Sequence, residues 1–145
     1  MVSAKKDDLL HQLFLKGTVP KELDGLYKGK LLEVIPANFV ESLGSIVAKL
    51  WLPWYGKEFY NKQRGDNLFP FRIHAFQFQT RIKKGLKDDI QVMQLDYNLP
   101  ENPRKVRNVI DELVCIGTNK YLGKAYLQER NDYRLVAFFS LTNGN

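Results

Sequence analysis

A chain of 145 residues with 44% apolar and 12% aromatic side chains can build one hydrophobic core, which favours a single domain over residues 1–145. Its only cysteine is Cys115, which excludes an intrachain disulfide and a thiolate metal cluster. The net charge is +6, but the sequence lacks zinc-finger spacing, a glycine-rich phosphate loop and an aromatic RNA platform, so we expect no nucleic-acid partner.

The first residues predict an outer helix. They carry charges where a secretory signal would need an uninterrupted apolar stretch, and no later apolar run approaches a membrane-spanning length, so we expect a cytoplasmic protein. Ser3 can cap a helix within residues 1–17, and its apolar side chains recur one turn apart, at Leu9, Leu10, Leu13 and Phe14. This helix is expected to be a lid or an outer brace.

The next stretch predicts the opening strand. Gly25 and Gly29 bracket Tyr27 just before an apolar run, which indicates a strand whose start passes close to other backbone and whose ring fills one end of a core. A second helix is expected at about residues 38–51, because apolar residues follow a helical stripe there and Pro53 cannot continue it.

From Trp54 onward the apolar pattern alternates, which is typical of strands. The predicted strands are 54–60, 71–83, 90–97, 106–116, 121–127 and 134–141, with a polar turn at 63–67. Strands joined by short turns favour an antiparallel meander that closes to remove its edges. The predicted fold is therefore mainly β: an antiparallel β-barrel over residues 22–142, with an N-terminal helix and a second helix after the first strand.

Several separated motifs also resemble a known family. They are Gly25-Leu26-Tyr27-Lys28-Gly29, Trp54-Tyr55-Gly56-Lys57-Glu58-Phe59, Leu95-Asp96-Tyr97, Val109-Ile110-Asp111-Glu112, Tyr121-Leu122-Gly123-Lys124 and Ala137-Phe138-Phe139-Ser140-Leu141. Their order resembles the bacterial family of uncharacterised proteins named for a G-x-W-x-G motif. The resemblance implies a small lipocalin-like (calycin) barrel with a hydrophobic interior and transfers no catalytic residue. Tyr27 stands where the family name calls for tryptophan, and a buried tyrosine can fill a similar space.

These patterns predict a protein that holds an apolar or amphipathic, lipid-like small molecule in a barrel cavity. The candidate ligand-binding residues are Tyr27, Trp51, Trp54, His74, Phe76, Phe78, Tyr97, Tyr121 and Phe138. No catalytic residue, metal site or cofactor is assigned, since the sequence carries no Ser-His-Asp order, metal-ligand spacing or dinucleotide fingerprint.

Two chemical alternatives stay open. An inward His74 could ligate haem iron or hydrogen-bond a ligand, although a structural histidine is the favoured interpretation. An isomerase or cyclase could use His74 or a barrel carboxylate as its base, where burial would raise the pKa of the carboxyl. Alternation places Asp111 and Glu112 on opposite faces of one strand, and Asp96 is expected to fix a turn.

Two surface features also have alternative interpretations. The apolar cluster from Trp51 to Tyr55 is either a mobile portal for a ligand or a plug that closes the barrel. Between Gly56 and Lys87 basic residues outnumber acidic ones, which is expected to be a solvated face; transient contact with an anionic membrane surface or an acidic partner stays open.

Overall fold

The computed structural model describes residues 2–35, 54–60 and 63–143, which include one helix and eight strands. They are α1 (Val2–Leu15), β1 (Gly25–Val34), β2 (Gly56–Tyr60), β3 (Arg64–Phe69), β4 (Ile73–Lys84), β5 (Gln91–Asp96), β6 (Val109–Gly117), β7 (Lys120–Glu129) and β8 (Asp132–Thr142). Short 3-10 turns at Pro70–Arg72 and Val106–Asn108 precede β4 and β6. The second helix predicted at about residues 38–51 lies outside the described residues.

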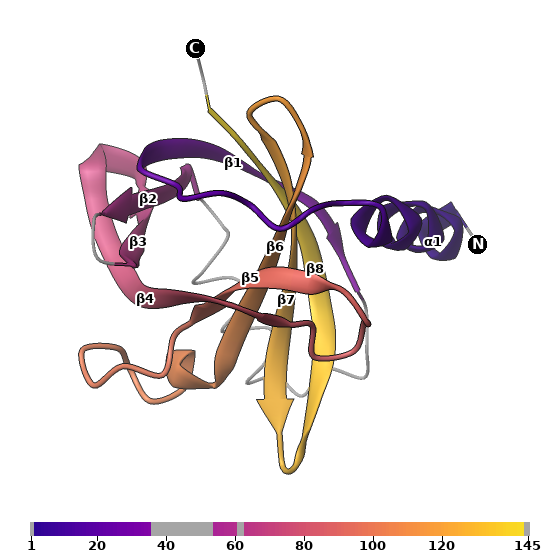
Figure 1. The fold of residues 1–145 in the computed structure, drawn as a ribbon. Helices are drawn as coiled ribbons and strands as arrows, with labels where there is room; N and C mark the ends of the chain where they lie inside the picture. The colour runs from indigo at the N-terminus through magenta and orange to yellow at the C-terminus, as the bar shows by residue number, and fades with distance from the viewer. Residues whose placement is uncertain (1, 36–53, 61–62, 144–145) are drawn as a thin grey trace.

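The eight strands form a closed barrel in which every neighbouring pair is antiparallel, in the order β1 to β8 (Figure 1). The barrel closes because β1 pairs with β2 at its start and with β8 along the rest of its length. Each described strand thereby has a partner on both sides, which is how closed barrels avoid the unpaired edges of an open sheet. The predicted antiparallel meander and its closure are confirmed.

Strand β3 corrects the sequence-based expectation of a turn at residues 63–67. Gly65, Asp66 and Asn67 are turn formers by propensity, yet β3 pairs with both β2 and β4. A Cβ atom added at Gly65 would lie 2.5 Å from the Phe78 ring, so the glycine gives that ring its space. The Asp66 and Asn67 side chains make hydrogen bonds on opposite faces of the sheet, and these contacts override the local preference.

A bulge in β4 changes which residues of that strand face inward. Asn67 pairs with Ala75, but Gly65 pairs with Phe78, so β4 has one residue more than β3 in this interval. The extra residue lies at the bulge, where Phe76 has a φ of 60°. The alternation that would place His74 on the same face as Phe78 is therefore broken, and a strict two-residue period could not have predicted this.

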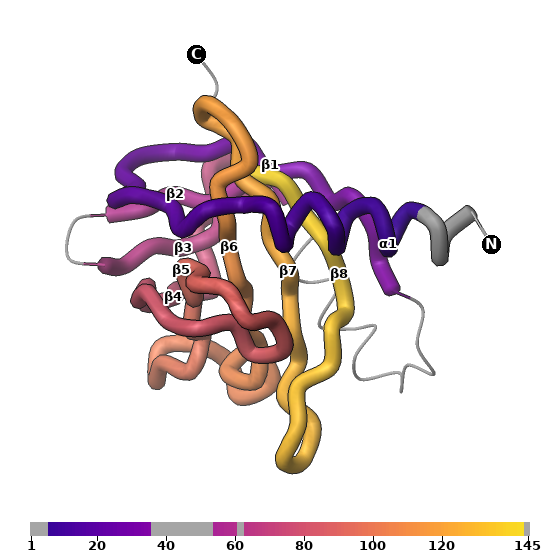
Figure 2. Tube along the Cα trace, turned by 45° about the vertical axis from the view of Figure 1, so that its right-hand side comes forward, coloured from indigo at the N-terminus to yellow at the C-terminus, as the bar shows by residue number. Residues whose placement is uncertain are grey.

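The barrel has two apolar layers, one inside it and one beneath α1. The inner layer contains Tyr27, Phe59, Phe78, Tyr97 and Phe139, together with aliphatic residues from the other strands. The outer layer is centred on Phe14 of α1, which is fully buried with Val92, Val114, Leu122 and Phe138. Figure 2 shows α1 lying across the outside of the barrel, which confirms the outer-brace interpretation. Within the described segments, no helix has the length and apolar character needed to cross a membrane.

The close backbone approach expected at the start of β1 is present, and the glycine that permits it is Gly56 on β2. A Cβ atom on Gly56, whose φ is 153°, would lie 2.0 Å from the carbonyl oxygen of Tyr27. At Gly29 the space is taken by the Trp54 ring, only 2.3 Å from where a Cβ would stand. These two glycines therefore bring β1 and β2 together and place Trp54 inside the barrel.

Candidate functional site

Strand β2 places a lysine in the barrel interior. Lys57 and Phe59 share the inward face, and the side chain of Lys57 is only 1% exposed. Burying an ammonium group among apolar side chains is costly unless it is paired and hydrogen-bonded. The partners of Lys57 therefore identify a site that the fold specifically maintains.

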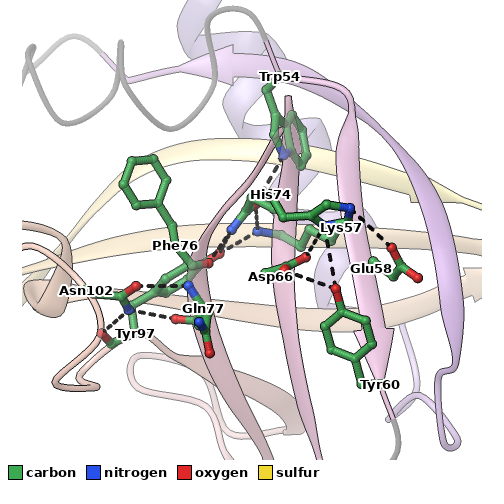
Figure 3. A network of polar contacts seen from close by, with 11 residues as sticks. Trp54, Lys57, Glu58, Tyr60, Asp66, His74, Phe76, Gln77, Tyr97 and Asn102 are labelled. Carbon is green, nitrogen blue, oxygen red and sulfur yellow. Dashed lines mark hydrogen bonds and ion pairs between the residues drawn. The ribbon is translucent and has the colours of Figure 1, made fainter. Parts of the chain in front are cut away.

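Three acceptors surround the amine of Lys57. Its Nζ atom donates to Asn67 Oδ1 at 2.7 Å and to the Tyr97 hydroxyl at 2.5 Å, and it lies 3.0 Å from Asp111 Oδ2. The Tyr97 hydroxyl donates in turn to Asp111 Oδ2 at 2.9 Å, and Trp54 Nε1 donates to Asn67 Oδ1 at 3.1 Å. We call Lys57, Asn67, Tyr97 and Asp111 the interior polar cluster. Figure 3 shows Lys57 and Tyr97 of this cluster together with Trp54.

Aromatic rings enclose this cluster. The Nζ atom of Lys57 lies 5.3 to 5.4 Å from the ring centres of Trp54, Phe78, Tyr97 and Phe139. Ring faces carry partial negative charge, so they stabilise a cation while excluding water. Beside these rings, Asp111 Oδ1 is buried and has no hydrogen-bond partner among the described residues.

Burial shifts the titration of all three ionisable members. It lowers the pKa of Lys57, against the opposing attraction of Asp111. It also raises the pKa of Asp111, against the stabilising charge of Lys57, and raises that of Tyr97 well above its usual value. Both shifts lower the cost of moving one proton from the amine to the carboxylate, and the two groups titrate as a coupled pair.

A pocket of about 320 Å³ opens at one end of the barrel, and we call it the end pocket. It is lined by Pro20, Glu22, Leu23, Phe59, Tyr60, Gln63, Arg64, Thr80, Arg81, Ile82 and Met93. Leu23, Phe59 and Met93 also belong to the inner apolar layer, so the pocket reaches the core of the barrel. Its volume is at the lower end of the range for small-molecule sites.

The end pocket and the interior polar cluster occupy neighbouring levels of the barrel. Phe59 lines the pocket, and Lys57 is the next inward residue of the same strand, about 7 Å away at the usual rise of a strand. On β5, Met93 lines the pocket and Leu95, the next inward residue, pairs with Asp111. Phe59 contacts Phe78 edge to face at 5.3 Å, and these rings separate the pocket from the cluster.

Most of the sequence-predicted site residues lie inside the barrel. Tyr27, Trp54, Phe78 and Tyr97 are buried in the inner layer, and Phe76 and Tyr121 pack against it. Edge-to-face contacts join Tyr121, Tyr27, Phe59, Phe78 and Tyr97 in a continuous series. The burial of Trp54 supports the plug interpretation for that residue, whereas Trp51 lies outside the described residues.

His74 lies on the outer surface of the barrel, which argues against the inward alternative and against its predicted place among the ligand-binding residues. Its Nδ1 atom is 2.9 Å from Asp66 Oδ1 and its Nε2 atom is 3.8 Å from Glu58 Oε1 (Figure 3). The hydrogen bond to Asp66 raises the pKa of His74, and burial opposes this shift. The side chain is 38% exposed, and this ion-paired surface position favours the structural interpretation over a haem ligand.

Phe138 also lies outside the barrel cavity. It is buried in the outer layer, where the ring lies 5.9 Å from Nζ of Lys124, a second buried lysine. Lys124 donates to Asp88 Oδ2 at 2.7 Å and to His11 Nδ1 at 2.9 Å. The aromatic residues of β8 alternate between the two layers, with Phe139 inside and Phe138 outside, so alternation alone could not say which one faces the cavity.

The carboxylates follow the predicted arrangement. Asp111 points into the interior polar cluster, while Glu112 points outward and accepts a hydrogen bond from the Leu86 amide at 2.6 Å. Burial raises the pKa of Glu112. Asp96 accepts from the Asn98 amide at 2.9 Å, which confirms its role in fixing a turn.

Lys57 and Asn67 are the site residues that sequence reasoning missed. Lys57 was counted with the basic surface between Gly56 and Lys87, and its burial removes it from that surface. One feature of the sequence could have indicated the burial of Lys57: it lies two residues before the apolar Phe59, on the same face of the strand, and Asp111 offered an inward carboxylate to pair with it. In the segments described, no three histidine, cysteine or acidic side chains form a group that could hold a metal ion.

Comparisons with known proteins support the fold. No family model matches the chain, and no curated protein matches its sequence. A crystal structure of a protein from Thermomonospora curvata is similar over 95% of this chain and 87% of its own, with a TM-score of 0.59 and 14% identity. At that identity the similarity shows a shared barrel fold and carries no information on activity.

Proposed function

We propose that this protein binds a small apolar or amphipathic molecule through the end pocket. The observation that carries the proposal is that the pocket reaches Leu23, Phe59 and Met93 of the inner apolar layer, inside a closed barrel. Eight antiparallel strands in up-and-down order are the arrangement of lipocalins, whose barrels hold one small ligand. The resemblance to the G-x-W-x-G family is consistent with this proposal and remains part of it.

The chemistry of the pocket favours a ligand with an apolar body. Phe59, Met93 and Leu23 offer a carbon surface whose burial against a ligand contributes about 25 cal/mol per Å² of apolar area. At the rim, Arg64 donates to Gln77 at 3.1 Å and to Glu101 at 3.0 Å. Arg81, which also lines the pocket, lies 3.4 Å from Asp96, so both pocket arginines are already paired and the apolar wall is the main source of affinity.

Filling the pocket tests this proposal. Thr80 lines the pocket, while its neighbour Gln79 is exposed on the other face of β4, so Thr80→Phe and Gln79→Phe form a matched pair. The neutral fluorescent probe N-phenyl-1-naphthylamine is titrated into both variants and the parent protein. We expect Thr80→Phe to weaken binding by about tenfold or more, because a ring occupies the ligand's volume, and Gln79→Phe to leave binding unchanged.

A second variant obstructs the end pocket at another position, so that the test does not depend on Thr80→Phe alone. Ile82 stands at the pocket rim and is 51% exposed, so Ile82→Trp narrows the entrance with little disturbance of the core. The proposal is wrong if all of these variants keep the native circular dichroism spectrum and bind the probe as tightly as the parent protein.

An isomerase or cyclase acting on an apolar substrate is a second candidate. The observation that favours it is the location of Asp111 inside the barrel, next to the Tyr97 hydroxyl and with one oxygen unpartnered among the described residues. Burial raises the pKa of Asp111 toward the range useful for proton transfer. If Asp111→Asn abolished turnover of a substrate while keeping its binding, this candidate would replace simple binding.

A further inference from the structure

We propose that Lys57 captures carbonyl compounds: its amine forms an imine with an aldehyde or ketone at the end of a slender apolar ligand. The inference rests on the end pocket of the proposed function, because that pocket would admit the ligand. It goes beyond binding by assigning a covalent step and a reacting atom.

The setting of Lys57 is suited to amine chemistry. A lysine amine reacts with carbonyl groups when desolvation keeps it unprotonated, and Lys57 is 1% exposed among four aromatic rings. Asn67 Oδ1 and the Tyr97 hydroxyl hold the Nζ atom in a fixed position. A hydrophobic side chain of similar length would fill the same space at lower cost, so the buried amine needs an explanation beyond packing.

The neighbouring Asp111 can accept and return the proton that imine formation requires. Nζ of Lys57 and Oδ2 of Asp111 are 3.0 Å apart, so one proton transfer converts the ion pair into a neutral amine and a carboxylic acid. Burial destabilises both charges and so lowers the cost of this transfer, as the opposite directions of the two pKa shifts indicate. The nucleophile and the acid that it needs are then in direct contact.

The step balances without an oxidant or a reductant. The lone pair of Nζ attacks the carbonyl carbon while the carbonyl oxygen takes the proton of Asp111, which gives a carbinolamine. The C–O bond then breaks, and the oxygen leaves as water after taking one proton from nitrogen. The products are an iminium ion on Lys57 and a carboxylate on Asp111, so the new cation keeps the counter-ion and the ring faces that stabilised the ammonium.

The path from the end pocket to the Lys57 amine limits the shape of the ligand. From Phe59 in the end pocket, Lys57 is about 7 Å deeper, at the next inward position of the strand. The Phe59 and Phe78 rings are in edge-to-face contact, with centres 5.3 Å apart, so the carbonyl end can reach Lys57 only when one of these rings turns aside. An unbranched aliphatic aldehyde meets this requirement better than a branched or polycyclic one.

Reductive trapping tests the inference. The intact protein is incubated with octanal and sodium cyanoborohydride, and the modified lysines are located by peptide mass spectrometry. Capture adds the mass of the aldehyde less one oxygen atom. We expect Lys57 to be labelled about tenfold more than exposed lysines such as Lys84, because a bound carbonyl is held beside its amine.

Two controls separate specific capture from general amine reactivity. Lys124 is almost as buried, at 2% exposed, but it pairs with Asp88 and lines a separate pocket on the outside of the barrel, so it reports labelling that does not use the end pocket and is expected to be labelled less than Lys57. Octanol has the same chain without a carbonyl and is expected to protect Lys57 by competition. These comparisons use the parent protein, so they do not depend on the folding of a Lys57→Met variant, in which the adduct should be lost.

The outcomes distinguish this inference from the proposed function. If the protein binds N-phenyl-1-naphthylamine in the end pocket but octanal labels surface lysines and leaves Lys57 unmodified, carbonyl capture is wrong and the binding function stands. If Lys57 is labelled no faster than Lys124, the route through the pocket is also wrong. Failure of the naphthylamine titration itself counts against the proposed function.

Discussion

Replacing Asp111 with asparagine tests the energetics of the interior polar cluster. The change keeps the size of the side chain but removes the negative charge 3.0 Å from Nζ of Lys57. Because both side chains are 1% exposed, water cannot replace the lost counter-ion. Breaking one partner of a buried ion pair costs about 3–5 kcal/mol.

A second estimate leads to a similar magnitude. Without Asp111, the folded protein can avoid a buried unpaired cation by leaving Lys57 unprotonated. For a lysine with an ordinary pKa of about 10.4, deprotonation at pH 7 costs about 4.6 kcal/mol, at 1.36 kcal/mol per pH unit. This value is an upper limit for the charge penalty, so we expect Asp111→Asn to reduce the free energy of unfolding by about 3–5 kcal/mol at pH 7.

The pH dependence follows from the same reasoning. With Lys57 neutral in the folded variant and protonated in the unfolded chain, the unfolded state binds more protons, and stability rises with pH up to about 10.4. Urea unfolding monitored by tryptophan fluorescence measures the free energy of unfolding at pH 7 and pH 9. The destabilisation caused by Asp111→Asn should be smaller at pH 9 than at pH 7.

Two comparisons check this prediction. Asp132 pairs with Lys87 at 2.6 Å but is 77% exposed, so Asp132→Asn should change stability little. The double variant Lys57→Met/Asp111→Leu should be more stable than Asp111→Asn alone, because it leaves no unpaired charge. A loss below about 1 kcal/mol for Asp111→Asn, with no dependence on pH, would refute the buried-pair reasoning.

Three further predictions concern the fold around the site. Gly56→Ala should cost several kcal/mol or prevent folding, since its Cβ would lie 2.0 Å from a carbonyl oxygen, whereas Gly25→Ala, with φ of 87° and open space, should cost about 1–2 kcal/mol in urea unfolding. Phe14→Ala should cost about 3–5 kcal/mol by the same assay, and Leu9→Ala, at 65% exposure, less than about 0.5 kcal/mol; equal losses would contradict the docking of α1. Because the pKa of folded His74 is raised, its stabilising contribution is complete below about pH 6.5 and is lost as pH rises through the folded value. The stability difference between the parent protein and His74→Gln should therefore shrink between pH 6 and pH 9, and a constant difference would argue against the Asp66 contact.

The sequence predicts the architecture well because the barrel depends on alternation and short turns, which are local signals. Most strands after Trp54 were expected close to where they lie, and the opposite orientations of Asp111 and Glu112 followed from the two-residue period. Strand β3 escaped prediction because Gly65, Asp66 and Asn67 have turn propensity, and only contacts with neighbouring strands make them a strand.

The site was harder to predict because it depends on non-local partners. A lysine in an alternating strand is usually exposed, and the burial of Lys57 depends on Asn67, Tyr97 and Asp111, which lie on three other strands. His74 was expected to share a face with Phe78 until the β4 bulge broke the alternation. A bulge of one residue leaves little trace in the sequence, yet it reverses the face of every residue beyond it.

The most direct test of the end pocket uses its methionine. The chain has two methionines, Met1 and Met93, and Met93 lies in the pocket lining, so a protein labelled with ¹³C-methyl methionine carries a reporter inside the site. On titration with N-phenyl-1-naphthylamine, the account predicts that the Met93 methyl resonance shifts in a saturable manner. A Met93 resonance that does not move at saturating probe would contradict the assignment of this pocket as the ligand site.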